Sequence, residues 1–209
     1  MPENLFPAFI KLAGRRCLVV GAGKIAEDKV QSLIKSDALV TVVAPHATSA
    51  IQKVAAAKEI AWRRRSFRAS DVRGFFLAVA ATADSAVNRS VFRAAQEKGI
   101  LCNAVDDPPN CDFYFPAVVR RGALQVAIST SGESPALAQR LRRELEANLD
   151  ESLGNSLRLL GNLRRAILAT SAATPARKRL LHLLASREGL AALADAGNQD
   201  ELASPGVKL

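Results

Sequence analysis

The sequence has few of the residues that mark disulfide-rich or zinc-stabilised proteins. Its 209 residues include three cysteines, Cys17, Cys102 and Cys111, an odd number with no C-x-x-C spacing and no accompanying histidine pair. This pattern argues against a disulfide framework and against a zinc knuckle, so we predict no metal-binding residues. It also favours a reducing, cytoplasmic location.

Long hydrophobic runs are also missing. No apolar stretch approaches the ~18 residues that a membrane span requires, and the N-terminal segment lacks the basic and apolar regions of a signal peptide. We therefore expect a cytoplasmic protein with no membrane partner. Apolar residues nevertheless make up 49% of the chain, which excludes a disordered protein and is sufficient for a real core.

Acidic residues are outnumbered by basic ones, 20 against 29, which gives a formal net charge of +9. Such a charge suggests an anionic partner: nucleic acid, an acidic membrane surface or a small polyanionic ligand. Aromatic residues make up only 5% of the chain, and neither a helix-turn-helix signature nor a basic face interleaved with aromatics is present. We therefore expect no nucleic-acid partner.

The first half of the chain alternates short β-branched runs with amphipathic segments of helical length. This alternation predicts an α/β fold with an N-terminal, Rossmann-like parallel sheet. A turn-forming cluster at residues 107–110 ends it, and a β-hairpin around residues 121–122, a helix at 135–149 and a C-terminal helical region follow. The expected strands are residues 17–20, 39–43, 75–80 and 101–105, and the expected helices between them are 24–35 and 87–98.

A glycine-rich turn follows the first predicted strand directly and opens the first predicted helix. The first glycine permits a tight turn, the second lets the backbone approach a pyrophosphate, and the last position needs only a small side chain. The helix that follows offers free N–H groups to phosphates. The alternative is a βα turn that binds nothing. The predicted cofactor-binding residues are Gly21, Ala22, Gly23, Lys24, Ile25 and Ala26.

A carboxylate that normally holds the ribose of NAD is missing at the end of the second predicted strand. No acidic residue occurs between Asp37 and Glu59. We expect the ribose to be held by backbone or hydroxyl groups in the segment that contains Pro45, Thr48 and Ser49. His46 and Lys53 are the nearest candidates for binding a 2′-phosphate, so both NAD and NADP stay open.

Several further motifs follow the glycine turn in a fixed order. They are Ala-Ala-Thr-Ala-Asp at 80–84 with Val87-Asn88, Cys-Asn-Ala-Val-Asp-Asp-Pro at 102–108, Phe-Pro-Ala at 115–117, and Ile-Ser-Thr-Ser-Gly-Glu-Ser-Pro at 128–135 with Leu137-Ala138 and Leu141-Arg142. With this set the sequence resembles the precorrin-2 dehydrogenase/sirohydrochlorin ferrochelatase family, the sirohaem-synthesis module. The resemblance covers roughly residues 5–149.

The resemblance implies NAD-dependent oxidation of precorrin-2 to sirohydrochlorin, and in bifunctional members the insertion of ferrous iron, as a substrate, to give sirohaem. It implies a homodimer and a tetrapyrrole substrate with several carboxylates. It also implies three parts: a Rossmann domain at 1–112, a dimerisation segment at 113–149 and a helical region at 150–209. A non-catalytic, dinucleotide-sensing regulator with a basic tail is the alternative function.

The resemblance also assigns site residues. Asp106 takes the position of the family's catalytic aspartate, a sensible general base because oxidation and metal insertion both release protons. The alternative is that Asp106 and Asp107 merely organise the turn that follows. Thr82 is expected along the cofactor. Thr130 lies where some members carry a serine that contacts substrate, and Ser131 lies where a glycine is common. We expect Thr130 and Ser131 to contact substrate although both depart from the family pattern, and simple helix capping by Ser134 is an equal alternative. Basic candidates for the substrate carboxylates include Arg120 and Arg142.

Overall fold

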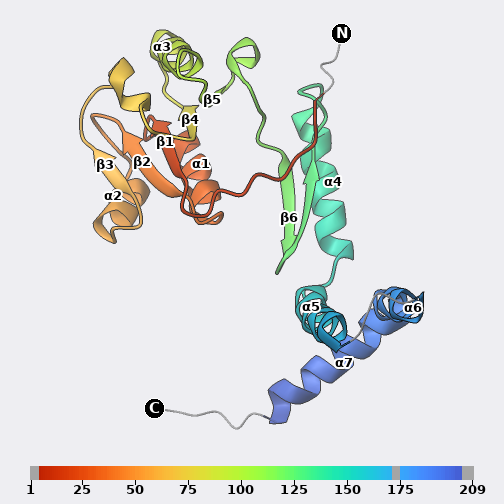
Figure 1. Cartoon of the computed structure of the whole chain (residues 1–209). Helices are drawn as coiled ribbons and strands as arrows, with labels where there is room; N and C mark the ends of the chain where they lie inside the picture. The colour runs from red at the N-terminus through yellow and green to blue at the C-terminus, as the bar shows by residue number, and fades with distance from the viewer. Residues whose placement is uncertain (1–4, 171–174, 204–209) are drawn as a thin grey trace. The chain divides into compact units, whose positions relative to one another are not determined.

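The computed structural model describes residues 5–170 and 175–203, which fall into two compact units (Figure 1). The first unit is Phe6–Phe115, and the second comprises the chain from Pro116 onward together with Leu5. The predicted α/β class is confirmed. The three-part division at residues 112 and 149 stays a prediction.

A parallel sheet of five strands forms the centre of the first unit, in the order β3-β2-β1-β4-β5. Helices connect the strands, and short 3₁₀ turns, η1 (Ala69–Val72) and η2 (Pro108–Asn110), follow β3 and β5. The strands are β1 (Arg16–Val20), β2 (Leu39–Val43), β3 (Ala61–Arg63), β4 (Leu77–Ala80) and β5 (Leu101–Ala104), and the helices are α1 (Lys24–Ile34), α2 (Ser49–Ala56) and α3 (Ser85–Gln96).

The strand order reverses between β1 and β4. From β1 the chain moves outward to β2 and β3, and it then returns to build β4 and β5 on the opposite side. In open parallel sheets, ligands bind in the crevice outside the carboxyl ends of the strands at such a reversal. The turns that follow β1, β4 and β5 therefore lie where a site is expected.

Two apolar clusters cover the two faces of this sheet. Along β1, Cys17 and Val19 belong to the cluster that includes Val30 of α1, whereas Leu18 and Val20 belong to the cluster on the α3 side. This split follows from the alternation of side chains along a strand. Because both faces are covered, β1 reads as a continuous hydrophobic run.

Most predicted elements of this unit are confirmed, with differences at their ends. The second strand matches its predicted bounds, while β4 begins at Leu77 instead of residue 75. Strand β3 and helix α2 were not predicted. Strand β3 has three residues and helix α2 has only one buried residue, Ile51, so neither leaves a clear periodic pattern.

The second unit begins with the predicted hairpin, in which β6 (Ala117–Arg121) pairs antiparallel with β7 (Leu124–Ile128). Helix α4 (Pro135–Asn148) contacts both strands, and Figure 1 shows it alongside β6. The Arg121 guanidinium donates to the carbonyl oxygens of Glu146 (2.6 Å) and Leu149 (2.8 Å), which satisfies backbone acceptors at the end of α4.

Three further helices follow α4: α5 (Ser152–Thr170), α6 (Pro175–Leu184) and α7 (Arg187–Ala203). Helix α5 meets the hairpin turn where Gly154 faces Gly122, and a Cβ on Gly154 would lie 3.0 Å from the Gly122 nitrogen. This close approach of the two backbones leaves little room for a side chain at either position. No helix within 5–170 and 175–203 combines the length and apolar character of a membrane span.

Candidate functional site

The glycine turn is tied to its neighbours through backbone contacts. Gly21 has φ +106°, and a Cβ there would lie 2.2 Å from the carbonyl oxygen of Ala81, so only glycine fits. Its N–H donates to the Val43 carbonyl of β2 at 3.0 Å. The turn therefore packs directly on the chain that leaves β4, and it is fixed at the reversal point of the sheet.

Gly23 is the N-cap of α1, and no side chain caps this helix end. An added Cβ at Gly23 would meet nothing within 4 Å, so open space adjoins the free N–H groups of the first helical turn. Ala26 is fully buried against the sheet. An uncapped helix start beside open space and a close-packed small residue fit a dinucleotide pyrophosphate.

The Thr82 loop after β4 is held by a buried amide from α3. The Asn88 Oδ1 accepts from the Thr82 N–H (3.1 Å) and lies 2.8 Å from its hydroxyl oxygen, while Asn88 Nδ2 donates to the Thr82 carbonyl (3.0 Å). The Asp84 carboxylate caps α3 by accepting from the N–H groups of Ala86 and Val87. Thr82 is thus fixed from both sides at the edge of the sheet.

Asp106 and Asp107 follow β5, and their carboxylates differ in whether they accept a hydrogen bond from the protein. The Asp107 Oδ2 accepts from Asn110 Nδ2 at 2.8 Å, so this carboxylate organises the turn at η2. Asp106 is exposed, has φ +60°, and its carboxylate accepts no hydrogen bond from any described residue. Of the two carboxylates, that of Asp106 is the one available for chemistry.

These turns enclose a hollow of about 280 Å³ at the carboxyl edge of the sheet. It brings together five of the predicted site residues, from three segments that are far apart in the sequence. The lining residues are Gly23, Lys24, Ile25, Ala81, Thr82, Ala83, Val105 and Asp106. A ligand in this hollow would contact the glycine turn on one side and a free carboxylate on the other.

Near the end of β2 and the start of α1, two polar side chains that could bind a cofactor already interact within the protein. Pro45 is exposed after β2, and Thr48 caps α2 by accepting from the Ile51 N–H at 3.4 Å. The Lys24 ammonium pairs with Glu27 at 2.7 Å. Hydrogen bonds from Lys24 and from Thr48 lower the pKa of Glu27. Lys24 and Thr48 therefore already have partners within the protein.

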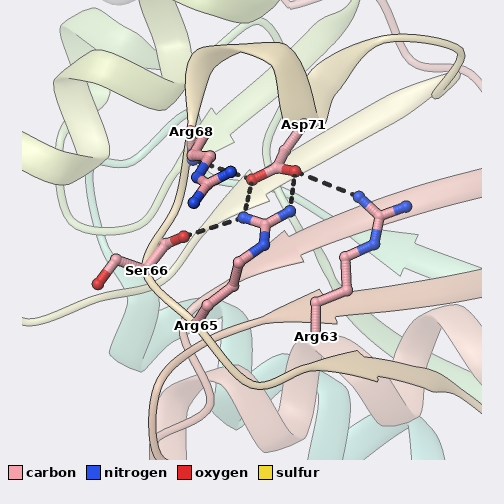
Figure 2. Close-up of polar contacts among 5 residues, drawn as sticks. All are labelled: Arg63, Arg65, Ser66, Arg68 and Asp71. Carbon is pink, nitrogen blue, oxygen red and sulfur yellow. Dashed lines mark hydrogen bonds and ion pairs between the residues drawn. The ribbon is translucent and has the colours of Figure 1, made fainter.

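Two arginines at β3, Arg63 and Arg65, share one buried carboxylate, that of Asp71, as Figure 2 shows. Asp71 accepts from both terminal nitrogens of Arg65 (2.7 and 2.5 Å), from Arg63 (3.2 Å) and from the Arg68 N–H (2.9 Å). The Arg65 guanidinium holds the pKa of Asp71 below its usual range. Arg63 and Arg65 are consequently engaged inside the fold, while Arg64 lies over the Trp62 ring.

The predicted substrate residues lie in the second unit. The Thr130 hydroxyl accepts from the Ser134 N–H at 3.1 Å, and Ser134 accepts from the Leu137 N–H at 3.2 Å, so this loop caps α4. Ser131 beside Thr130 has φ +51°. Arg120 is exposed on β6, whereas Arg142 pairs with Glu146 at 2.5 Å.

Sequence reasoning missed three side-chain arrangements that the structure shows. Asn88 was noted only as part of a motif, and its buried amide is seen only in the fold. Asp71, which pairs with two arginines, and Lys29, whose ammonium lies 4.2 Å from the centre of the Phe115 ring, carried no local signal. No cluster of three or more metal-ligating side chains occurs in the part of the chain that the structure describes.

Comparisons with known proteins agree with this arrangement. Residues 8–117 match the family described as putative NAD(P)-binding, and residues 121–148 match the sirohaem biosynthesis protein central family. Siroheme synthase of Neisseria meningitidis serogroup C / serotype 2a is 42% identical over 176 residues, which are 84% of this chain and 36% of that protein. Siroheme synthase of Methylococcus capsulatus is 42% identical over 164 residues, which are 78% of this chain and 35% of that protein.

A solved structure extends the likeness to almost the whole chain. The precorrin-2 dehydrogenase SirC has a TM-score of 0.79 and 28% identity, and the match covers 94% of this chain and 98% of SirC. By contrast, the chain spans about a third of the length of the siroheme synthases named above. With an NAD(P)-binding domain followed by a sirohaem central segment, the chain belongs to the precorrin-2 dehydrogenase/sirohydrochlorin ferrochelatase family.

Proposed function

We propose that this chain oxidises precorrin-2 to sirohydrochlorin with NAD. One observation carries the proposal: the hollow at the carboxyl edge of the sheet joins the glycine turn, Thr82 and the free carboxylate of Asp106. The likeness to SirC over nearly the full length of both chains supports the choice of substrate. The carboxylate-rich macrocycle also suits the net charge of +9.

The glycine turn would hold the cofactor through its backbone. Gly21 and Gly23 let the chain approach the pyrophosphate, the free N–H groups at the start of α1 bind it, and Ala26 keeps the helix close to the sheet. NAD bound there supplies a hydride acceptor. We propose NAD as the cofactor: Arg63 and Arg65, which lie on or just beyond the strand beside β2, are paired with Asp71 and are not available for a 2′-phosphate. His46 and Lys53 are the remaining 2′-phosphate candidates, and the comparison of NAD with NADP tests them.

Asp106 would act as the general base. Oxidation of a saturated tetrapyrrole carbon removes a hydride and a proton, so the reaction needs a proton acceptor as well as an oxidant. The Asp106 carboxylate lines the hollow and accepts no hydrogen bond from the described residues, which leaves its oxygens available. Insertion of ferrous iron, taken as a substrate, also requires proton removal, and the same carboxylate would serve that step.

A direct assay tests this function. Purified protein is mixed with precorrin-2 and either NAD or NADP, with and without Fe²⁺, and the absorption spectrum is followed. We expect sirohydrochlorin to form with NAD, and sirohaem when Fe²⁺ is added. No turnover together with tight NAD binding would instead support the regulator that the sequence left as an alternative.

The matched pair Asp106→Asn and Asp107→Asn tests the base. Asp106→Asn is expected to lower kcat about 10²- to 10⁴-fold, the range for a general base, while the Kd for NAD stays unchanged. Asp107→Asn is the control, because an amide oxygen can still accept from Asn110. Full activity of Asp106→Asn would remove Asp106 from the mechanism.

We also propose that the chain acts as a homodimer through the segment at 113–149. A two-stranded sheet is marginally stable by itself, and Leu137 and Leu145 remain exposed on α4. In the same segment we propose that Thr130, Ser131, Arg120 and Arg142 contact the carboxylates of the substrate. Light scattering after size exclusion measures the mass directly, and a monomeric mass would contradict the dimer.

A further inference from the structure

The end of the first unit folds back onto α1 and places an aromatic ring beside a lysine. Asn103 of β5 donates through Nδ2 to the Phe113 carbonyl at 2.7 Å, which fixes the returning segment. The rings of Phe113 and Phe115 lie 5.5 Å apart, and both pack on the apolar cluster of the α1 side. This segment therefore forms a fixed apolar wall next to α1.

Lys29 projects from α1 onto this wall. Its ammonium lies 4.2 Å from the centre of the Phe115 ring, a cation–π distance, and the side chain is half-buried. Among the described residues, no oxygen atom hydrogen-bonds or ion-pairs with this ammonium. Burial lowers the pKa of Lys29, and the charges of Asp28 and Asp106 only partly oppose that effect.

A half-buried ammonium that donates no hydrogen bond to a protein oxygen can still form a charge-assisted hydrogen bond with a ligand anion. Lys29 comes four residues after Ile25, which lines the hollow of the proposed site, so the two side chains share one face of α1. The charge of Asp106 on the opposite wall of the hollow acts on the Lys29 ammonium as well. The ring of Phe115 limits where the ammonium can move, so the charge is held in place before a ligand arrives. Such a preorganised charge suits a carboxylate at the rim of a ligand whose reacting part faces Asp106.

We propose that Lys29 is a substrate-binding residue whose ammonium receives one carboxylate of the tetrapyrrole and thereby orients the macrocycle on Asp106. This inference rests on the proposed function. A substrate-binding role depends on the negative charge of the ligand, whereas a purely structural role for Lys29 does not. The proposed role also separates Lys29 from Lys24, whose ammonium already pairs with Glu27.

The test compares Lys29→Gln with Lys35→Gln, an exposed lysine at the end of the same helix. Binding of sirohydrochlorin and of NAD is titrated separately on the full chain. We expect Lys29→Gln to raise the Kd for sirohydrochlorin about 10- to 100-fold, as expected when one charge-assisted hydrogen bond is lost. The Kd for NAD should not change, Lys29→Arg should restore most of the affinity, and Lys35→Gln should match the wild type.

A second ligand isolates the charge. The methyl ester of sirohydrochlorin keeps the macrocycle but has neutral side groups, so wild type and Lys29→Gln should bind it equally. Equal binding of acid and ester by the wild-type protein would overturn the inference even if Lys29→Gln failed to fold. If the wild type oxidises precorrin-2 and Lys29→Gln binds sirohydrochlorin as tightly as the wild type does, the role proposed for Lys29 is wrong while the proposed function stands. If the wild type binds no tetrapyrrole, both are wrong.

Discussion

The Asn88 amide is expected to support both the stability of the first unit and the shape of the hollow. It is buried on α3 and makes three contacts with one residue, Thr82, at 2.8 to 3.1 Å. Replacement by alanine removes all three contacts at once. It also leaves the N–H and carbonyl of Thr82 without their partners on a half-buried loop.

The magnitude follows from those contacts. A neutral hydrogen bond contributes about 1 kcal/mol net, and a buried group left without a partner costs about 1 to 3 kcal/mol. Because Thr82 is only half-buried, water can replace part of what is lost. We therefore expect Asn88→Ala to lower the free energy of unfolding by about 2 to 3 kcal/mol. The loosened loop should also reduce turnover by about 10- to 100-fold through misplacement of the site.

Urea unfolding followed by circular dichroism measures the stability, and the precorrin-2 assay measures the rate. Ser90→Ala is the control on the same helix, because the Ser90 hydroxyl makes one exposed bond to the Val87 carbonyl. It should change stability by less than about 0.5 kcal/mol. A cycle with Thr82→Val should give a coupling energy of at least about 0.5 kcal/mol. If Asn88→Ala is as stable as Ser90→Ala and fully active, the reasoning fails.

Three further predictions follow from the same unit. Gly21→Ala should lower the free energy of unfolding by about 3 kcal/mol and prevent NAD binding, since its Cβ meets a carbonyl oxygen at 2.2 Å. Gly14 also has a positive φ, +70°, but a Cβ added there would meet nothing within 4 Å. Urea unfolding of Gly14→Ala should therefore show a decrease of only about 1 kcal/mol in the free energy of unfolding. The pKa of Asp71 is lowered in the folded state, so its contribution is present above the unfolded pKa of about 3.9 and is lost as the pH falls further. Wild type should therefore lose more stability than Asp71→Asn between about pH 6 and pH 3, and parallel pH profiles would contradict the ion-pair cluster. Burial raises the pKa of Cys17 to about 11 and of Cys102 to about 12, so peptide mapping should find both thiols unmodified by iodoacetamide at about pH 8 until urea is added.

The parts of the site that depend on local sequence could be predicted. The glycine turn lies between a strand of buried apolar residues and an amphipathic helix, and its conformation follows from those neighbours. Asp106 comes two residues after the last residue of β5, so the parallel sheet alone brings it to the edge that holds the glycine turn. The hairpin and the Ser134 cap were likewise predictable, because turn and cap residues act within a few positions.

The parts that depend on distant contacts could not be predicted. Nothing in the sequence marks Arg63 and Arg65 as paired, because Asp71 reaches them only after the chain has turned through η1. Lys29 shares no motif with Phe115, which lies 86 positions further along the chain, and only the returning segment brings the ring to it. The same holds for β3, whose three residues become a strand because β2 offers a free edge.

The left-handed backbone of Asp106 limits what evolution can place there. Aspartate and asparagine tolerate φ near +60° better than most side chains, and asparagine lacks the acid. Glutamate carries the same functional group, yet it would combine a longer reach with a disfavoured main-chain conformation. The shorter of the two acidic residues is thus selected by the path of the peptide chain, before any demand of the reaction is considered.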